Sequence, residues 1–169
     1  MYFMDTTLNG TTTDNYEDMM KFLNNIKYDY IDLGFLIHQQ SPSIDDKNKI
    51  IAASEIITDC CWGLTCLLDD DAYIEQIYEW ISFARAYHLG FVQIVLDHEN
   101  LVDLCMEFIQ WCTHQNIQIF CLIRKANQYP SHQFNIIALK CLDLNAIVGI
   151  DDDLTMLPPE LYTIIHRIK

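Results

Sequence analysis

Acidic side chains dominate the positions at which this sequence could do chemistry. Aspartate triplets occupy positions 69–71 and 151–153, and Asp5 lies in the first apolar segment. Carboxylate oxygens suit hard divalent cations such as Mg²⁺ or Mn²⁺, and Asp5 and Asp151 are the candidate metal ligands. Aspartates at helix starts also accept hydrogen bonds from backbone N–H groups and favour the helix dipole. Metal binding and helix capping therefore both remain open for the triplets.

Few basic or nucleophilic groups accompany these carboxylates. Arg124 and Lys125 follow the fifth apolar run, where they either bind an anionic substrate and stabilise an enolate or neutralise neighbouring aspartates. Of the six histidines, none forms a His-x-His or His-x-x-x-His pair, and only His98, directly after Asp97, is retained as a candidate acid or base. Arg124 and His98 are thus the candidate catalytic residues.

Motifs for nucleotide chemistry and for serine nucleophiles are absent. Neither Gly-x-Ser-x-Gly nor Gly-x-x-x-x-Gly-Lys-Ser/Thr occurs, and the chain has only five glycines. A net charge of −14 repels nucleic-acid phosphates and anionic lipid headgroups. The sequence therefore argues against a nucleotide-dependent enzyme and against nucleic-acid or membrane partners.

Length and composition predict one domain over residues 1–169, because 51% of the residues are hydrophobic and no Gly/Ser-rich or Pro-rich linker interrupts the chain. No apolar run is long enough to span a bilayer, and the N-terminus lacks the basic region of a signal peptide. The seven cysteines lie in apolar stretches without zinc-type spacing. We interpret them as reduced core residues of a cytoplasmic protein.

The elements that position these residues follow a repeating pattern of an apolar run and a segment with helical periodicity. A spacing of about 30 residues is typical of a βα unit, and uninterrupted apolar runs indicate strands that are covered on both faces. Asp14 with Glu17, and Ser41 with Pro42, are predicted to start the first two helices, the second over residues 42–58. We predict a parallel β/α fold of six units that resembles an incomplete TIM barrel, with a doubly wound open sheet as the alternative. The apolar runs begin near Met1, Tyr28, Cys61, Phe91, Ile117 and Ala146.

Three segments resemble the DRE-TIM metallolyase family, which includes 4-hydroxy-2-oxovalerate aldolase, HMG-CoA lyase and isopropylmalate synthase. Residues 5–10, Asp-Thr-Thr-Leu-Asn-Gly, are similar to the family's Asp-Thr-Thr-Leu-Arg-Asp-Gly, and residues 31–35, Ile-Asp-Leu-Gly-Phe, to its Ile-Glu-Val-Gly-Phe. Residues 150–161 are similar to its sixth-strand pattern, which contains Pro-Glu. The resemblance implies a TIM-barrel fold and metal-dependent carbon–carbon bond chemistry on a 2-oxo acid.

The departures from the family pattern concern its catalytic groups. Asn9 and Gly10 replace the enolate-stabilising arginine and the metal-ligating aspartate, and Leu154 replaces the glycine of the sixth-strand pattern. The family's His-x-His metal ligands belong to a seventh strand, beyond Lys169. The leading expectation is therefore a catalytically degenerate homologue that acts as a binding or accessory subunit and needs no cofactor.

Two alternatives remain beside it. The first is a lyase or acyltransferase for a small 2-oxo acid, with Mg²⁺ or Mn²⁺ on Asp5 and Asp151. Its substrate-binding residues would be Thr7, Asn9 and Lys125. The second is a chain whose barrel is completed by a partner protein. Unpaired edges on the first and sixth strands, expected at residues 2–8 and 146–150, predict a homo-oligomer or such a partner complex.

Overall fold

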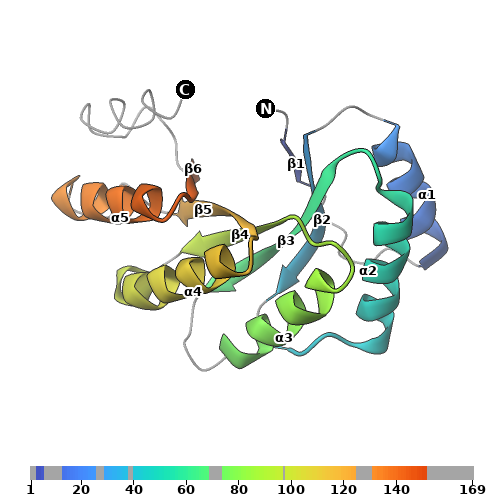
Figure 1. The fold of residues 1–169 in the computed structure, drawn as a ribbon, viewed down its shortest axis with the longest axis horizontal. Coiled ribbons are helices and arrows are strands. Elements are labelled where there is room, and N and C mark those ends of the chain that lie inside the picture. Colours follow the sequence, from blue (N-terminus) through green and yellow to red (C-terminus); the bar gives the residue numbers. More distant parts are fainter. Residues whose placement is uncertain are drawn as a thin grey trace. The chain divides into compact units, whose positions relative to one another are not determined.

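Strands and helices alternate along the chain, as Figure 1 shows. The structure, a computed structural model, describes residues 3–5, 13–25, 29–37, 40–68, 74–96, 98–124 and 131–151. The predicted α/β class with parallel strands is confirmed. The strands are β1 (Phe3–Asp5), β2 (Tyr30–Ile37), β3 (Cys61–Leu68), β4 (Phe91–Leu96), β5 (Gln118–Arg124) and β6 (Ile147–Asp151). The helices are α1 (Thr13–Asn24), α2 (Ile44–Ile56), α3 (Ile74–Arg85), the 3₁₀ turn η2 (Glu99–Leu101), α4 (Val102–His114) and α5 (Ser131–Asp143).

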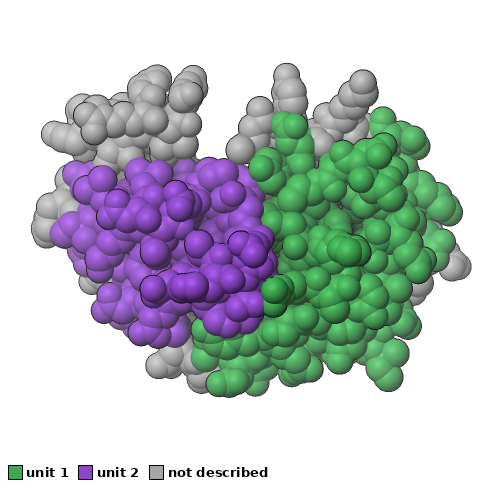
Figure 2. Space-filling view, viewed as in Figure 1, with its two compact units in different colours: residues 1–66, 72–92 green, residues 67–71, 93–169 purple. Residues whose placement is uncertain are grey.

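The chain divides into two compact units, coloured separately in Figure 2. Unit 1 comprises residues 1–66 and 72–92, and unit 2 comprises residues 67–71 and 93–169. Strands β3 and β4 contribute residues to both units. The single domain over residues 1–169 stays a prediction.

Strand order in unit 1 follows the chain without reversal. The neighbours β1 and β2 are parallel, as are β2 and β3, and β4 comes next after β3. At the start of β4, the backbone N–H of Gly90 donates to the carbonyl oxygen of Trp62 at 3.0 Å. A doubly wound sheet instead reverses its strand order at a switch point. From one strand to the next, the order of the described strands in unit 1 therefore advances across the sheet without a switch point.

Unit 2 continues with parallel β5 and β6, and the order within it is β4-β5-β6. The side chain of Cys121, on β5, lies beside those of Cys105 on α4 and Cys141 on α5. Both helices therefore cover the same face of β5. Right-handed crossovers that advance in one direction produce this one-sided arrangement.

The start of α2 differs from the prediction. Ser43, and not Ser41, is the N-cap: its hydroxyl accepts from the N–H of Asp46 at 3.1 Å, and its own N–H donates to the Asp46 carboxylate at 2.9 Å. Ser43 and Asp46 have the three-residue spacing of a capping box, which satisfies two N–H groups at once. Pro42, predicted as the first helical residue, therefore precedes the cap.

The ends of α1 also differ from the prediction. The helix begins at Thr13, so Asp14 lies inside it and is not its N-cap. At the other end, Asn25 donates from its side chain to the carbonyl oxygen of Lys21 at 2.9 Å. This bond supplies a partner for a carbonyl group of the last turn and closes the helix.

Helices α3, α4 and α5 share one type of C-terminal ending. Shortly after the last residue of each helix, a single residue adopts a left-handed conformation. The residue that follows it donates its N–H to a carbonyl group of the last helical turn, as in a Schellman motif. Asparagine and histidine tolerate this conformation better than most non-glycine residues. The left-handed residues are His88 (φ 68°), Asn116 (φ 58°) and Asn145 (φ 58°), and the bonds are Leu89 to Ala84 (3.2 Å), Ile117 to Cys112 (3.0 Å) and Ala146 to Cys141 (2.9 Å).

Candidate functional site

Three predicted site residues end strands, at the edge where parallel β/α proteins place their functional groups. Asp5 is the last residue of β1, Arg124 of β5 and Asp151 of β6. Asp5 belongs to unit 1, and the other two belong to unit 2. His98 is described as well, whereas the other predicted site positions lie outside the described residues: Thr7, Asn9, Lys125 and the aspartates at 69–71, 152 and 153.

In unit 2, Arg124 and Asp151 are register partners on neighbouring strands. Alternate residues of a strand face opposite sides of the sheet. Positions in register on neighbouring parallel strands occupy the same face of the sheet, so positions 124 and 151 share one face. Neutralisation of an aspartate by Arg124 and binding of an anionic substrate by Arg124 both stay predictions.

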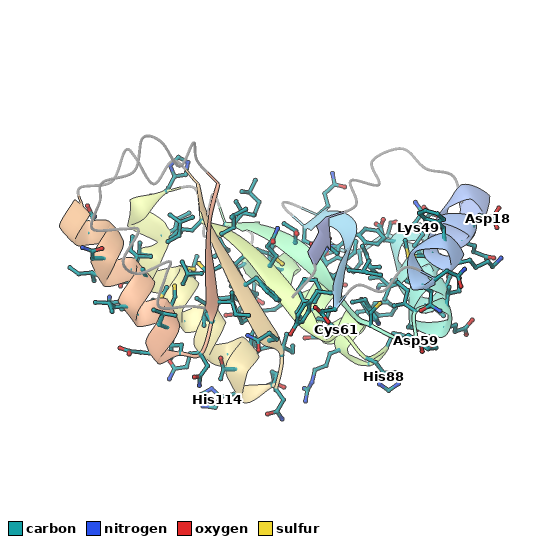
Figure 3. The ribbon with its side chains drawn as sticks, turned by 90° about the horizontal axis from the view of Figure 1, so that it is seen from above. Asp18, Lys49, Asp59, Cys61, His88 and His114 are labelled. Carbon is teal, nitrogen blue, oxygen red and sulfur yellow. The ribbon has the colours of Figure 1, made fainter. Side chains whose placement is uncertain are left out.

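His98 lies between β4 and η2 in unit 2. Its side chain is exposed, and its carbonyl oxygen accepts from the N–H of Leu101 at 3.2 Å. His88 and His114, labelled in Figure 3, are exposed as well. A catalytic role for His98 stays a prediction.

Unit 1 holds a buried polar pair that the sequence analysis missed. Asp32, on β2, has no exposed surface, and Thr65, on β3, is 9% exposed. The hydroxyl of Thr65 donates a hydrogen bond to a carboxylate oxygen of Asp32. Because a buried carboxyl group is costly unless it is hydrogen-bonded, this bond stabilises the placement of Asp32 inside the sheet. A polar residue in each of two apolar strands was the signal in the sequence.

An irregularity in β2 accompanies this pair. Asp32 is in register with Gly63, whereas Leu36 is in register with Thr65, so four steps along β2 match two along β3. Such bulges redirect side chains and are common beside functional sites. The Asp32–Thr65 hydrogen bond runs diagonally at this irregularity, because the two residues belong to different register pairs.

Asp5 completes a row of polar and small residues across unit 1. It is in register with Asp32, which is in register with Gly63. The aromatic ring of Phe91 lies so close to Gly63 that a Cβ atom there would come within 2.5 Å of it. Phe91 also meets the edge of the Tyr30 ring at a centroid distance of 5.6 Å. The candidate site of unit 1 is therefore the buried Asp32–Thr65 pair, with Asp5 at the register position beside Asp32 and aromatic rings near the start of the strands.

The part of the chain that the structure describes contains no preformed metal site. Among these residues, no three or more His, Cys, Asp or Glu side chains are grouped so as to hold an ion. The predicted ligands Asp5 and Asp151 belong to different units. A site that uses them stays a prediction.

The cysteines are all free thiols, five buried and two half-exposed. Cys60 and Cys61 were expected in the core but are half-exposed. They lie at the start of β3, at one end of the sheet. Burial raises the pKa of Cys60, and burial together with the neighbouring Cys60 raises the pKa of Cys61 to about 11. The buried thiols are Cys66, Cys105, Cys112, Cys121 and Cys141.

Alkylation of the native protein should separate these two classes. Iodoacetamide is expected to label Cys60 and Cys61 first, and faster as the pH rises, because the thiolate reacts and their pKa values are raised. Cys112, whose pKa is raised to about 12 by burial, serves as the buried comparison. Peptide mass spectrometry over a time course measures the order. Labelling of Cys112 as fast as Cys60 in folded protein would contradict the burial described above.

A comparison with models of known protein families finds none that matches the chain, and a comparison with curated proteins finds no matching sequence. The resemblance to DRE-TIM metallolyases therefore rests on the motifs at residues 5–10, 31–35 and 150–161 alone. Within the described ranges, no helix has the length and apolar character needed to cross a membrane.

Proposed function

We propose that this protein is a catalytically degenerate relative of the aldolase-type TIM barrels and acts as a binding or accessory subunit in the cytoplasm. The observation that carries the proposal is the register of Arg124 with Asp151. Because opposite charges at paired positions favour one another, we expect Asp151 to make Arg124 less available to stabilise an enolate. The replacement of the family's Arg-Asp by Asn9 and Gly10 supports the same conclusion.

The winding of the strands supports the barrel-type part of this proposal. In each unit the strand order advances in one direction, and α4 and α5 lie on one face of β5. One-sided helices and unidirectional order are features of a β/α barrel and not of a doubly wound sheet. Free cysteines are in keeping with a reducing compartment.

The register of Asp5 with Asp32 favours one alternative, a metal-dependent lyase or acyltransferase. Two carboxyl positions on adjacent strands, about 5 Å apart in a sheet, offer oxygen ligands to Mg²⁺ or Mn²⁺. The metal would polarise the carbonyl group of a small 2-oxo acid. In this alternative, Thr7, Asn9 and Lys125 bind the substrate.

Turnover and metal binding distinguish the two functions. We expect no release of pyruvate from 4-hydroxy-2-oxo acids in the presence of Mn²⁺, because the family's catalytic pair is replaced. We also expect no low-micromolar Mn²⁺ binding by calorimetry. A turnover of about 1 s⁻¹ or more, or tight Mn²⁺ binding that Asp5→Asn removes, would establish the enzyme alternative instead.

Association with a second chain is the second part of the proposal. Among the described residues, β1 pairs only with β2, and β6 pairs only with β5. Ile147 and Val148 on β6 are half-buried. Strand edges with apolar side chains and free backbone groups favour pairing with another chain. We infer a homo-oligomer, or a complex with a partner protein that completes the barrel.

Light scattering coupled to size exclusion tests this association at micromolar concentration. We expect a mass of at least twice the 19.8 kDa of the chain. Ile147→Lys, on β6, should lower the mass, because lysine on an edge disfavours strand pairing. Ile44→Lys, at a position 80% exposed on α2, is the matched control and should leave the mass unchanged. A monodisperse wild-type monomer that unfolds cooperatively would overturn the association.

A further inference from the structure

We draw no further inference here: the strongest candidate, the cluster of buried thiols formed by Cys105, Cys121 and Cys141 between α4, β5 and α5, is accounted for by packing of unit 2, since the neighbouring thiols together with burial raise the pKa of Cys121 and Cys141 and no metal-holding group occurs among the described residues.

Discussion

Replacing Gly63 with alanine is expected to destabilise the protein by about 3 kcal/mol, because overpacking a rigid core forces atoms apart. A Cβ atom at this position would come within 2.5 Å of the ring of Phe91 and equally close to its carbonyl oxygen. A flexible side chain can rotate away from such a contact, but the backbone of β4 can yield only by shifting the strand. Urea unfolding, followed by tryptophan fluorescence and circular dichroism, measures the free energy of unfolding.

Gly149→Ala provides the matched control on another strand. Among the described residues, a Cβ atom there would meet the Cδ1 atom of Leu122, at 3.3 Å, and a leucine side chain can adjust by a few tenths of an ångström. Its effect should stay below about 1 kcal/mol. Adding Phe91→Leu to Gly63→Ala should recover only part of the loss, because the carbonyl contact persists. If Gly63→Ala unfolded at the wild-type urea concentration, the contact between β3 and β4 would be wrong.

Thr65→Val is expected to reduce the free energy of unfolding by about 2 kcal/mol, because it removes a donor to a buried carboxyl group without changing the volume of the side chain. Thr65 is buried and its hydroxyl donates to Asp32, which has no exposed surface. Thr65→Ser keeps the hydroxyl group and should therefore retain most of the hydrogen-bond energy. Urea unfolding of the two variants beside the wild type measures the difference.

A double-mutant cycle with Asp32→Asn isolates the pair. Asp32 and Thr65 each take part in further interactions, so a single substitution reports more than their mutual bond. The coupling energy from the cycle should be about 1 kcal/mol or more. Equal stability of Thr65→Val and Thr65→Ser, or a coupling energy near zero, would contradict a bond between β2 and β3 at this point.

The positions of the strands could be predicted from the sequence with little error. The described strands begin at Cys61 and Phe91, where apolar runs begin, and within two residues of the expected starts elsewhere. Strands of a parallel sheet are covered on both faces, so they appear in the sequence as continuous apolar runs. Helix faces were also predictable, because apolar residues at helical spacing mark the buried face of a helix. Ile77 and Ile81 of α3, and Cys105 and Phe108 of α4, are buried as their spacing indicates.

Helix ends were less predictable because several residues compete for the same role. Ser41 and Ser43 both precede α2, and the choice of Ser43 depends on its reciprocal bonds with Asp46. In α1, which ends at Asn24, the side chain of Asn25 closes the last turn by donating to the carbonyl oxygen of Lys21. Periodicity describes a face of a helix, whereas its end is decided by individual backbone hydrogen bonds.

The candidate site depended on tertiary structure. Asp5, Arg124 and Asp151 were predictable because they follow apolar runs, and each does end a strand. Asp32 and Thr65 were not, because they lie inside strands and meet through an irregular register of β2 and β3. Apolar patterning is local and can be read residue by residue. Register joins segments that are distant in the chain, so only the folded sheet decides which polar groups share a hydrogen bond.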